Sequence, residues 1–139
     1  MGVHAPSFAT TDDEGNVVRL DDFAGKKRIL TFVLPGCSSC AGAIQTLNTF
    51  LQTKPAETVL LIGSGDHLLN RAYASEHDAH LPLLTPSPDF DADLYHIRGV
   101  PFVFVLDERG TIRAKGVVND SDGLQRLLVA AFAPVHISH

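Results

Sequence analysis

The 139-residue sequence contains no tryptophan, a single methionine and only two cysteines. With 45% hydrophobic residues, the chain has enough apolar side chains for a continuous core without a disulfide as a staple. The sequence also lacks an apolar run long enough to span a bilayer and an opening that reads as a signal peptide. We therefore expect a single domain over residues 1–139, with its core at about 3–132.

Basic residues are also scarce and scattered. Lysine and arginine number 11 against 16 aspartates and glutamates, which gives a formal net charge of -5. The longest basic cluster, Lys26 to Arg28, is expected to be a solvated turn before a strand. A nucleic-acid partner is therefore not expected.

The two cysteines stand close together, as Cys37 and Cys40 with Ser38 and Ser39 between them, directly after the apolar run 29–34. A lone Cys-x-x-Cys between a strand and a helix is the arrangement used for thiol–disulfide exchange. A helix N-terminus lowers the pKa of the first thiol, and the second lies one turn away. We expect Cys37 to be the nucleophile and Cys40 the resolving thiol, with both serines donating hydrogen bonds to the thiolate.

The rest of the chain alternates between strand and helix patterns. Strands are predicted at 17–20, 29–34, 58–62, 83–84, 101–106 and 111–118, and helices at 38–52, 66–76 and from 121 onward. Asp66 and either Asp120 or Ser121 are expected to cap helices, and 89–96 to form one or two helical turns. Helices between strands imply parallel neighbours. The pattern predicts an α/β fold, a central mixed β-sheet with helices on both faces.

This order of elements, with the cysteine pair opening the first long helix, resembles the thioredoxin fold. Thioredoxin-like proteins carry a cis-proline at the start of the strand that faces the active site, and Pro101 matches that position. The segments 5–8 and 15–26 are similar to the redoxin branch of this superfamily. Within it, residues 112–119 are similar to the MauD family of methylamine-utilisation accessory proteins, as are Pro35-Gly36 and Ser64 to Asp66.

The resemblance implies an extracytoplasmic thiol–disulfide oxidoreductase whose partners are proteins with thiols or disulfides and a redox partner protein. A membrane anchor is expected only upstream of this sequence, and we expect a monomer without a cofactor. Pro101 is expected beside the sulfurs, and the backbone of Val100 is expected to pair with a substrate strand. Pro35 and Gly36 are expected on the same substrate-binding surface.

The sequence departs from these relatives at three places. Gly36 precedes the first cysteine where many thioredoxins have tryptophan, and Thr31 stands where thioredoxin has a buried aspartate that takes a proton from the second thiol. Ala43 occupies the place of an acid in the reductases of cytochrome maturation. The proton acceptor for Cys40 therefore remains open, and a water molecule is one candidate.

Two other functions stay open. A peroxiredoxin-type thiol peroxidase would need a proline and a threonine or serine at set distances before the reactive cysteine, and neither cysteine has both. A redox-inactive binding module would keep its partner after Cys37→Ser. A zinc site is not expected, because no second cysteine pair exists and His67, His77 and His80 are distant.

Overall fold

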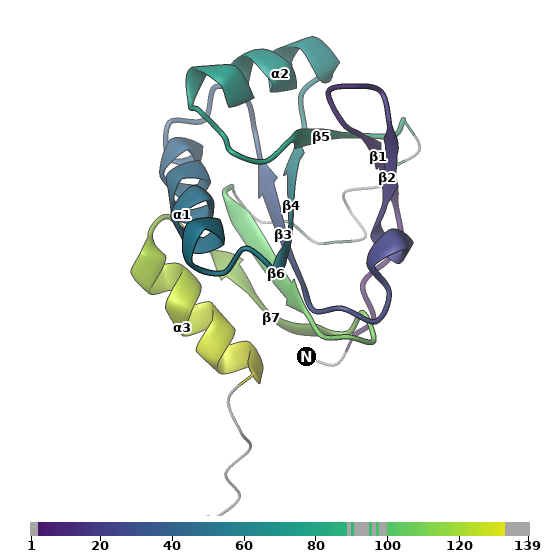
Figure 1. Ribbon diagram of the computed structural model, residues 1–139, viewed down its shortest axis with the longest axis vertical. Coiled ribbons are helices and arrows are strands. Elements are labelled where there is room, and N and C mark those ends of the chain that lie inside the picture. Colours follow the sequence, from purple (N-terminus) through teal and green to yellow (C-terminus); the bar gives the residue numbers. More distant parts are fainter. Residues whose placement is uncertain (1–2, 89, 91–94, 96, 98–99, 133–139) are drawn as a thin grey trace, which may run out of the picture.

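The computed structural model describes residues 3–88, 90, 95, 97 and 100–132 (Figure 1). Its α-helices are α1 (Cys40–Thr53), α2 (His67–Glu76) and α3 (Ser121–Phe132), and η1 (Leu20–Phe23) is a short 3-10 helix. Its strands are β1 (Ala9–Thr11), β2 (Val17–Arg19), β3 (Arg28–Val33), β4 (Thr58–Gly63), β5 (Leu83–Pro86), β6 (Phe102–Leu106) and β7 (Ile112–Val117).

The strands form one seven-stranded mixed sheet in the order β2-β1-β5-β4-β3-β6-β7. Strands β3, β4 and β5 run parallel, and the other pairs are antiparallel. All six residues of β3 are buried, as a continuous apolar run in the centre of a sheet predicts. The mixed sheet of the predicted α/β fold is confirmed, and its central strand leads directly to the cysteine pair.

Strand β1 was not predicted. It has only three residues, too few for a recognisable alternation, and it exists because it pairs with β2 on one side and with β5 on the other. The partner in β5 lies more than 70 residues away, with Thr10 opposite Pro86. No local pattern in the sequence could reveal this pairing.

The sheet separates two buried clusters. We call the first the helix-covered face, because all three α-helices contribute to it: Ile29, Val33, Cys40, Ile44, Leu47, Leu61, Tyr73, Leu83, Val103, Val105, Ala114, Val118, Leu124 and Ala131. We call the second the aromatic face: Ala5, Phe8, Leu20, Leu30, Phe32, Leu60, Ile62, Leu84, Tyr95, Phe102, Phe104, Leu106 and Ile112.

The two faces are covered differently. Among the described residues, the aromatic face receives side chains from η1 and from Tyr95, which lies in a 3-10 turn, and the chain's opening segment packs there too. Helices α1 and α3 lie side by side on the opposite face (Figure 1). The opening segment contributes Ala5 and Phe8 to the aromatic face.

The helix ends follow the predicted caps. The Asp66 carboxylate accepts a hydrogen bond from the Leu69 N–H at 2.8 Å and begins α2. Asp120, rather than Ser121, caps α3, because its carboxylate accepts from the Gly123 N–H at 2.8 Å. The helical turns expected at 89–96 fall largely outside the described residues. In the described part of the chain, no helix is both long and apolar enough to cross a membrane.

Candidate active site

A tight turn carries the chain from β3 to the first cysteine. The Cys37 N–H donates to the Leu34 carbonyl at 3.0 Å, and Gly36 has a φ of +89°. Proline followed by a residue with positive φ is the sequence requirement of a type II turn, which Pro35 and Gly36 meet. This turn carries Cys37 out of the buried strand and leaves it half-buried beyond the carboxyl end of β3.

Helix α1 begins at Cys40, two residues later than predicted. Ser39 is the N-cap, in helical backbone geometry and without a side-chain capping bond. A turn precedes the helix, in which the Cys40 N–H donates to the Cys37 carbonyl at 3.2 Å. Cys37 therefore lies just before the helix rather than in its first turn.

The two thiols, both free, have opposite surroundings. Partial burial opposes ionisation of Cys37, but hydrogen bonds from Cys40 and Ser39 hold its pKa below the ordinary value. Cys40 is fully buried on the helix-covered face, and this burial raises its pKa to about 12. The half-buried thiol therefore has the lowered pKa, and the fully buried thiol has the raised one.

The two serines are not equivalent. The Ser39 hydroxyl lies 3.6 Å from the Cys37 sulfur and is one of the groups that lower its pKa. Ser38 is exposed, and the hydrogen bonds that lower the Cys37 pKa come from Ser39 and Cys40. The structure therefore brings Ser39 to the sulfur and leaves Ser38 directed to solvent.

Tyr73 is a member of the site that sequence reasoning missed. This side chain of α2 is only 4% exposed, and its hydroxyl donates to the Cys37 carbonyl at 2.7 Å. Burial raises its pKa to about 12, and the neighbouring Cys40 and Cys37 sulfurs add to that effect. Helical spacing with Asn70, also buried, marks Tyr73 as facing inward. Its partner depends on how α2 packs against the start of α1, which the sequence does not display.

The peptide bond between Val100 and Pro101 is cis, as expected. Val100 contacts the helix-covered face, to which Cys37 is also packed. It also lines a largely apolar groove of about 510 Å³, together with Leu34, Ile62, Gly65 and Phe90 among others. This groove runs along the carboxyl ends of β3 and β4, beside the turn that carries the first cysteine.

The other two residues expected on this surface lie at its rim. The Pro35 ring packs so closely on Gly65 that a Cβ there would lie 2.8 Å from its Cγ. Gly36 is exposed between Pro35 and Cys37. The sequence-predicted residues Pro35, Gly36 and Val100 therefore share one side of the molecule with Cys37.

The structure also places the departures from related proteins. Thr31 is fully buried, and its hydroxyl oxygen has no hydrogen-bond partner. Because side chains alternate along a strand, Thr31 shares the helix-covered face with Ile29 and Val33. Ala43 is 2% exposed. The two positions at which related proteins carry an acid are therefore buried and uncharged.

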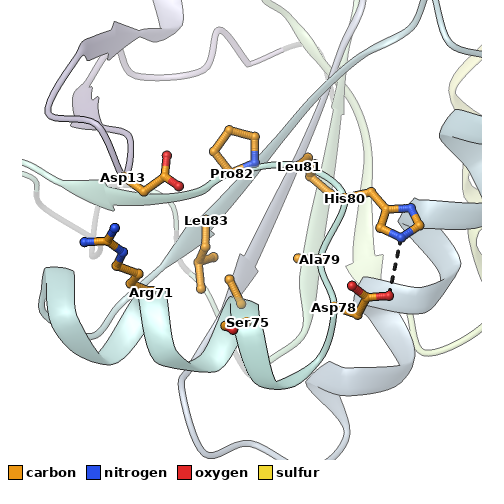
Figure 2. Close-up of a pocket in the computed structure, with 10 residues that line it drawn as sticks. Asp13, Arg71, Ser75, Asp78, Ala79, His80, Leu81, Pro82 and Leu83 are labelled. Atoms are coloured by element: carbon orange, nitrogen blue, oxygen red, sulfur yellow. Dashed lines mark ion pairs between the residues drawn. The ribbon is translucent and has the colours of Figure 1, made fainter.

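A second hollow, of about 480 Å³, lies between α2 and the segment that leads into β5 (Figure 2). Asp13, Arg71 and His80 give it a polar lining without a cysteine. His80 pairs with Asp78 at 3.6 Å, but their side chains are 48% and 90% exposed, so the pair is solvent-screened. Among the described residues, no three histidine, cysteine or acidic side chains converge as a metal site.

Comparison with known proteins gives a consistent result. A family model described as Redoxin matches residues 1–128. The methylamine utilization protein MauD of Methylorubrum extorquens is 26% identical over 132 residues, which cover 94% of this chain and 63% of that protein. The thiol-disulfide oxidoreductase ResA of Geobacillus thermodenitrificans is 26% identical over 116 residues, 81% of this chain and 67% of that protein. The chain thus spans less than two thirds of the length of this MauD.

Solved structures show the same fold. A putative thiol:disulfide interchange protein DsbE from Chlorobium tepidum superposes with a TM-score of 0.82 at 23% identity, covering 94% of this chain and 96% of that one. A thiol:disulfide interchange protein from a Bacteroides species gives 0.75 at 25% identity, with coverage of 100% and 96%. The thioredoxin-like fold expected from the sequence is confirmed.

Proposed function

The chain belongs to the Redoxin family, and from this membership we propose that it is a thiol–disulfide oxidoreductase that exchanges disulfides with protein partners through Cys37 and Cys40. The relatives named thiol-disulfide oxidoreductase support the reaction class. One observation carries the assignment to these residues: the accessible thiol has a lowered pKa, and the buried thiol three residues later has a raised one. Nucleophile and resolving thiol need this asymmetry.

The proposed reaction proceeds in two displacements. The Cys37 thiolate attacks a partner disulfide, forms a mixed disulfide and releases the first partner sulfur as a thiolate. Cys40 then loses its proton to solvent or to the departing sulfur and attacks the Cys37 sulfur, which releases the second partner thiolate. Two electrons pass from the dithiol to the partner, and the reverse sequence oxidises a partner dithiol.

The groove at Val100 supports a protein substrate. It is largely apolar, and its lining includes Leu34, which follows β3 and is 47% exposed. We propose that an extended partner segment lies against Val100, with Pro101, Pro35 and Gly36 flanking the sulfurs and Ser39 at the thiolate. The expected partners are proteins with thiols or disulfides and one redox partner that resets the dithiol.

We further propose that this domain acts outside the cytoplasm, as a monomer. The supporting comparisons include a relative described as an exposed lipoprotein of Streptococcus pneumoniae and one described as secreted by Mycobacterium tuberculosis. These share the fold at 21% and 20% identity. An anchor in the full-length protein and a role in methylamine metabolism remain separate hypotheses.

Equilibration with glutathione buffers, followed by thiol trapping, tests the proposal. The cysteine pair should behave as a two-electron couple with a reduction potential between about -270 mV and about -120 mV. A potential near the first value would make the protein a reductant, and one near the second would make it a disulfide donor. Cys40→Ser is the matched variant and should accumulate a mixed disulfide, whereas Cys37→Ser should form none. No exchange in the wild type would leave the binding-module alternative, and peroxide consumption with a thiol donor would favour the peroxidase.

A further inference from the structure

Tyr73 is the polar group that the fold brings to both cysteines. Its hydroxyl donates to the Cys37 carbonyl at 2.7 Å, and the same carbonyl accepts from the Cys40 N–H at 3.2 Å. Tyr73 and Cys40 belong to one buried cluster and are 4% and 0% exposed. The hydroxyl therefore sits at the turn that joins the two thiols, on the buried side of that turn.

Hydrogen bonds between α1 and the segment after α2 also hold Tyr73 in position. Two side chains of α1 donate to the chain just after α2: Gln45 to the His77 carbonyl at 2.8 Å, and Asn48 to the Asp78 carbonyl at 2.9 Å. Asn48 also accepts from the His80 N–H at 2.8 Å. These bonds hold the end of α2 against the helix that Cys40 begins. Tyr73 is thus held in place relative to Cys40 by more than its own hydroxyl.

The resolving step requires a buried thiol to ionise, and Tyr73 lies close enough to support that ionisation. Cys40 must ionise inside an apolar cluster, while Thr31 and Ala43 stand where related proteins have acids. A buried thiolate is costly unless a donor faces it. Hydrogen bonding from Tyr73 lowers the pKa of Cys40 against the larger, opposing effects of burial and of Cys37. With its own pKa raised to about 12, Tyr73 keeps its proton at neutral pH and acts as a donor rather than a base.

We propose that Tyr73 is a positioning and donor residue of the dithiol. With Cys40 protonated, its hydroxyl donates to the Cys37 carbonyl; when Cys40 ionises to resolve the mixed disulfide, that donor turns to the Cys40 sulfur. The proton of Cys40 leaves to solvent or to the departing thiolate, and Tyr73 remains protonated throughout. This inference rests on the proposed function and adds to it the group that supports the second displacement.

Single-turnover kinetics with dithiobis(nitrobenzoate) separate the two displacements. The reduced protein and one equivalent of this disulfide yield the protein disulfide, two thionitrobenzoate ions and two protons. The first ion reports attack by Cys37, and the second reports resolution by Cys40. Tyr73→Phe should leave the first phase within about twofold and slow the second about tenfold, with its pH midpoint moved upward, because a hydrogen bond to a charged group is lost.

The chain offers a matched control. The other tyrosine, Tyr95, donates its hydroxyl to the Pro6 carbonyl on the aromatic face. Tyr95→Phe should leave both phases unchanged. An unaltered second phase in Tyr73→Phe, or equal slowing of both phases, would overturn the inference while leaving the oxidoreductase proposal intact. A wild type that releases no second ion would overturn both.

A second measurement does not depend on Tyr73→Phe folding. The groups facing Tyr73 are Cys37, Cys40 and Glu76, and the His77 ring packs edge-on at 4.5 Å. Because the sequence lacks tryptophan, Tyr73 is the sole intrinsic emitter in Tyr95→Phe. Its emission changes when the phenol itself ionises in alkali, and the neighbouring Cys40 sulfur opposes that ionisation. In Cys40→Ser the alkaline midpoint of Tyr73 emission should therefore lie lower than in the reduced protein that keeps Cys40. An unchanged midpoint would contradict the interaction.

Discussion

The two faces of the sheet bury their tyrosines in the same way and use them differently. Tyr73 on the helix-covered face donates to the Cys37 carbonyl, and Tyr95 on the aromatic face donates to the Pro6 carbonyl. Burial raises both pKa values. Each hydroxyl meets the ordinary requirement that a buried polar group be paired. Only the Tyr73 hydroxyl lies beside sulfurs, so only this buried tyrosine can act on the ionisation of a thiol.

The packing of the two faces also differs. On the aromatic face, Phe104 meets Phe32 and Tyr95 edge-on, with ring centroids 5.8 and 5.2 Å away. On the helix-covered face, aliphatic side chains of α1 such as Ile44 and Leu47 surround Cys40. The comparison suggests that the aromatic face stabilises the fold, while the helix-covered face also sets the protonation of the dithiol.

The largest expected effect separates the two thiols within the helix-covered face. Cys37→Ser should abolish disulfide exchange, because the remaining thiol is fully buried with a pKa of about 12. Cys40→Ser should still attack a disulfide but stop at the mixed disulfide, which mass spectrometry detects. Rapid alkylation of Cys40 at neutral pH in Cys37→Ser would contradict the assigned order.

A core truncation on each face tests the division of roles. Phe104→Ala should lower the free energy of unfolding by about 3–5 kcal/mol, measured by urea denaturation, and leave the Cys37 pKa unchanged. Ile44→Ala, which empties space one turn after Cys40, should cost about 2–5 kcal/mol and alter the second thiol's reactivity as well.

Thiolate absorbance measured against pH follows both thiols and provides the second readout for Phe104→Ala and Ile44→Ala. Equal changes in the Cys40 titration for the two variants would mean that the two faces are not separable. Both variants should keep the opening segment, because Ala5 and Phe8 belong to the aromatic face.

Part of the fold and of the candidate site could be predicted from the sequence. The buried run of β3, the caps at Asp66 and Asp120 and the cysteine pair all have local patterns, and resemblance pointed to the cis-proline at Pro101. Tyr73 could not be predicted, because its partner is chosen by the packing of two helices. The single-domain boundary and the substrate-binding roles of Val100, Pro35 and Gly36 remain predictions.

The free energy of unfolding should fall in alkali, and it should fall further in the reduced protein than in the disulfide form, because Cys40 on the helix-covered face titrates only when reduced. In the reduced protein, Cys40 and Tyr73 have pKa values raised from 9.0 and 10.0 to about 12. Between about pH 9 and 12 the folded state therefore holds more protons than the unfolded chain, so stability falls as pH rises. The lowered pKa of Cys37 acts in the opposite direction. As the pH rises toward the ordinary thiol value of 9.0, the unfolded chain holds more protons at this thiol than the folded state does, so the stabilising contribution of Cys37 grows.

Urea denaturation of the reduced and oxidised forms across this range checks the prediction. In the disulfide form Cys40 no longer titrates, so the fall should be smaller. Tyr95, whose pKa is raised in both forms, supplies a common background that Tyr95→Phe would remove. Identical slopes for the two redox forms would show that Cys40 does not titrate as its burial requires.

The smallest expected effect concerns Thr31, the one polar side chain of β3 on the helix-covered face. Its hydroxyl is fully buried without a partner, so Thr31→Val should raise the free energy of unfolding by up to about 1 kcal/mol and leave both phases of thiol exchange unchanged. Thr31→Ser keeps the hydroxyl, loses a methyl group and should destabilise by about 1 kcal/mol. Slower resolution in Thr31→Val would show that this hydroxyl serves Cys40, and the helix-covered face would then hold two donors where Tyr73 is proposed to suffice.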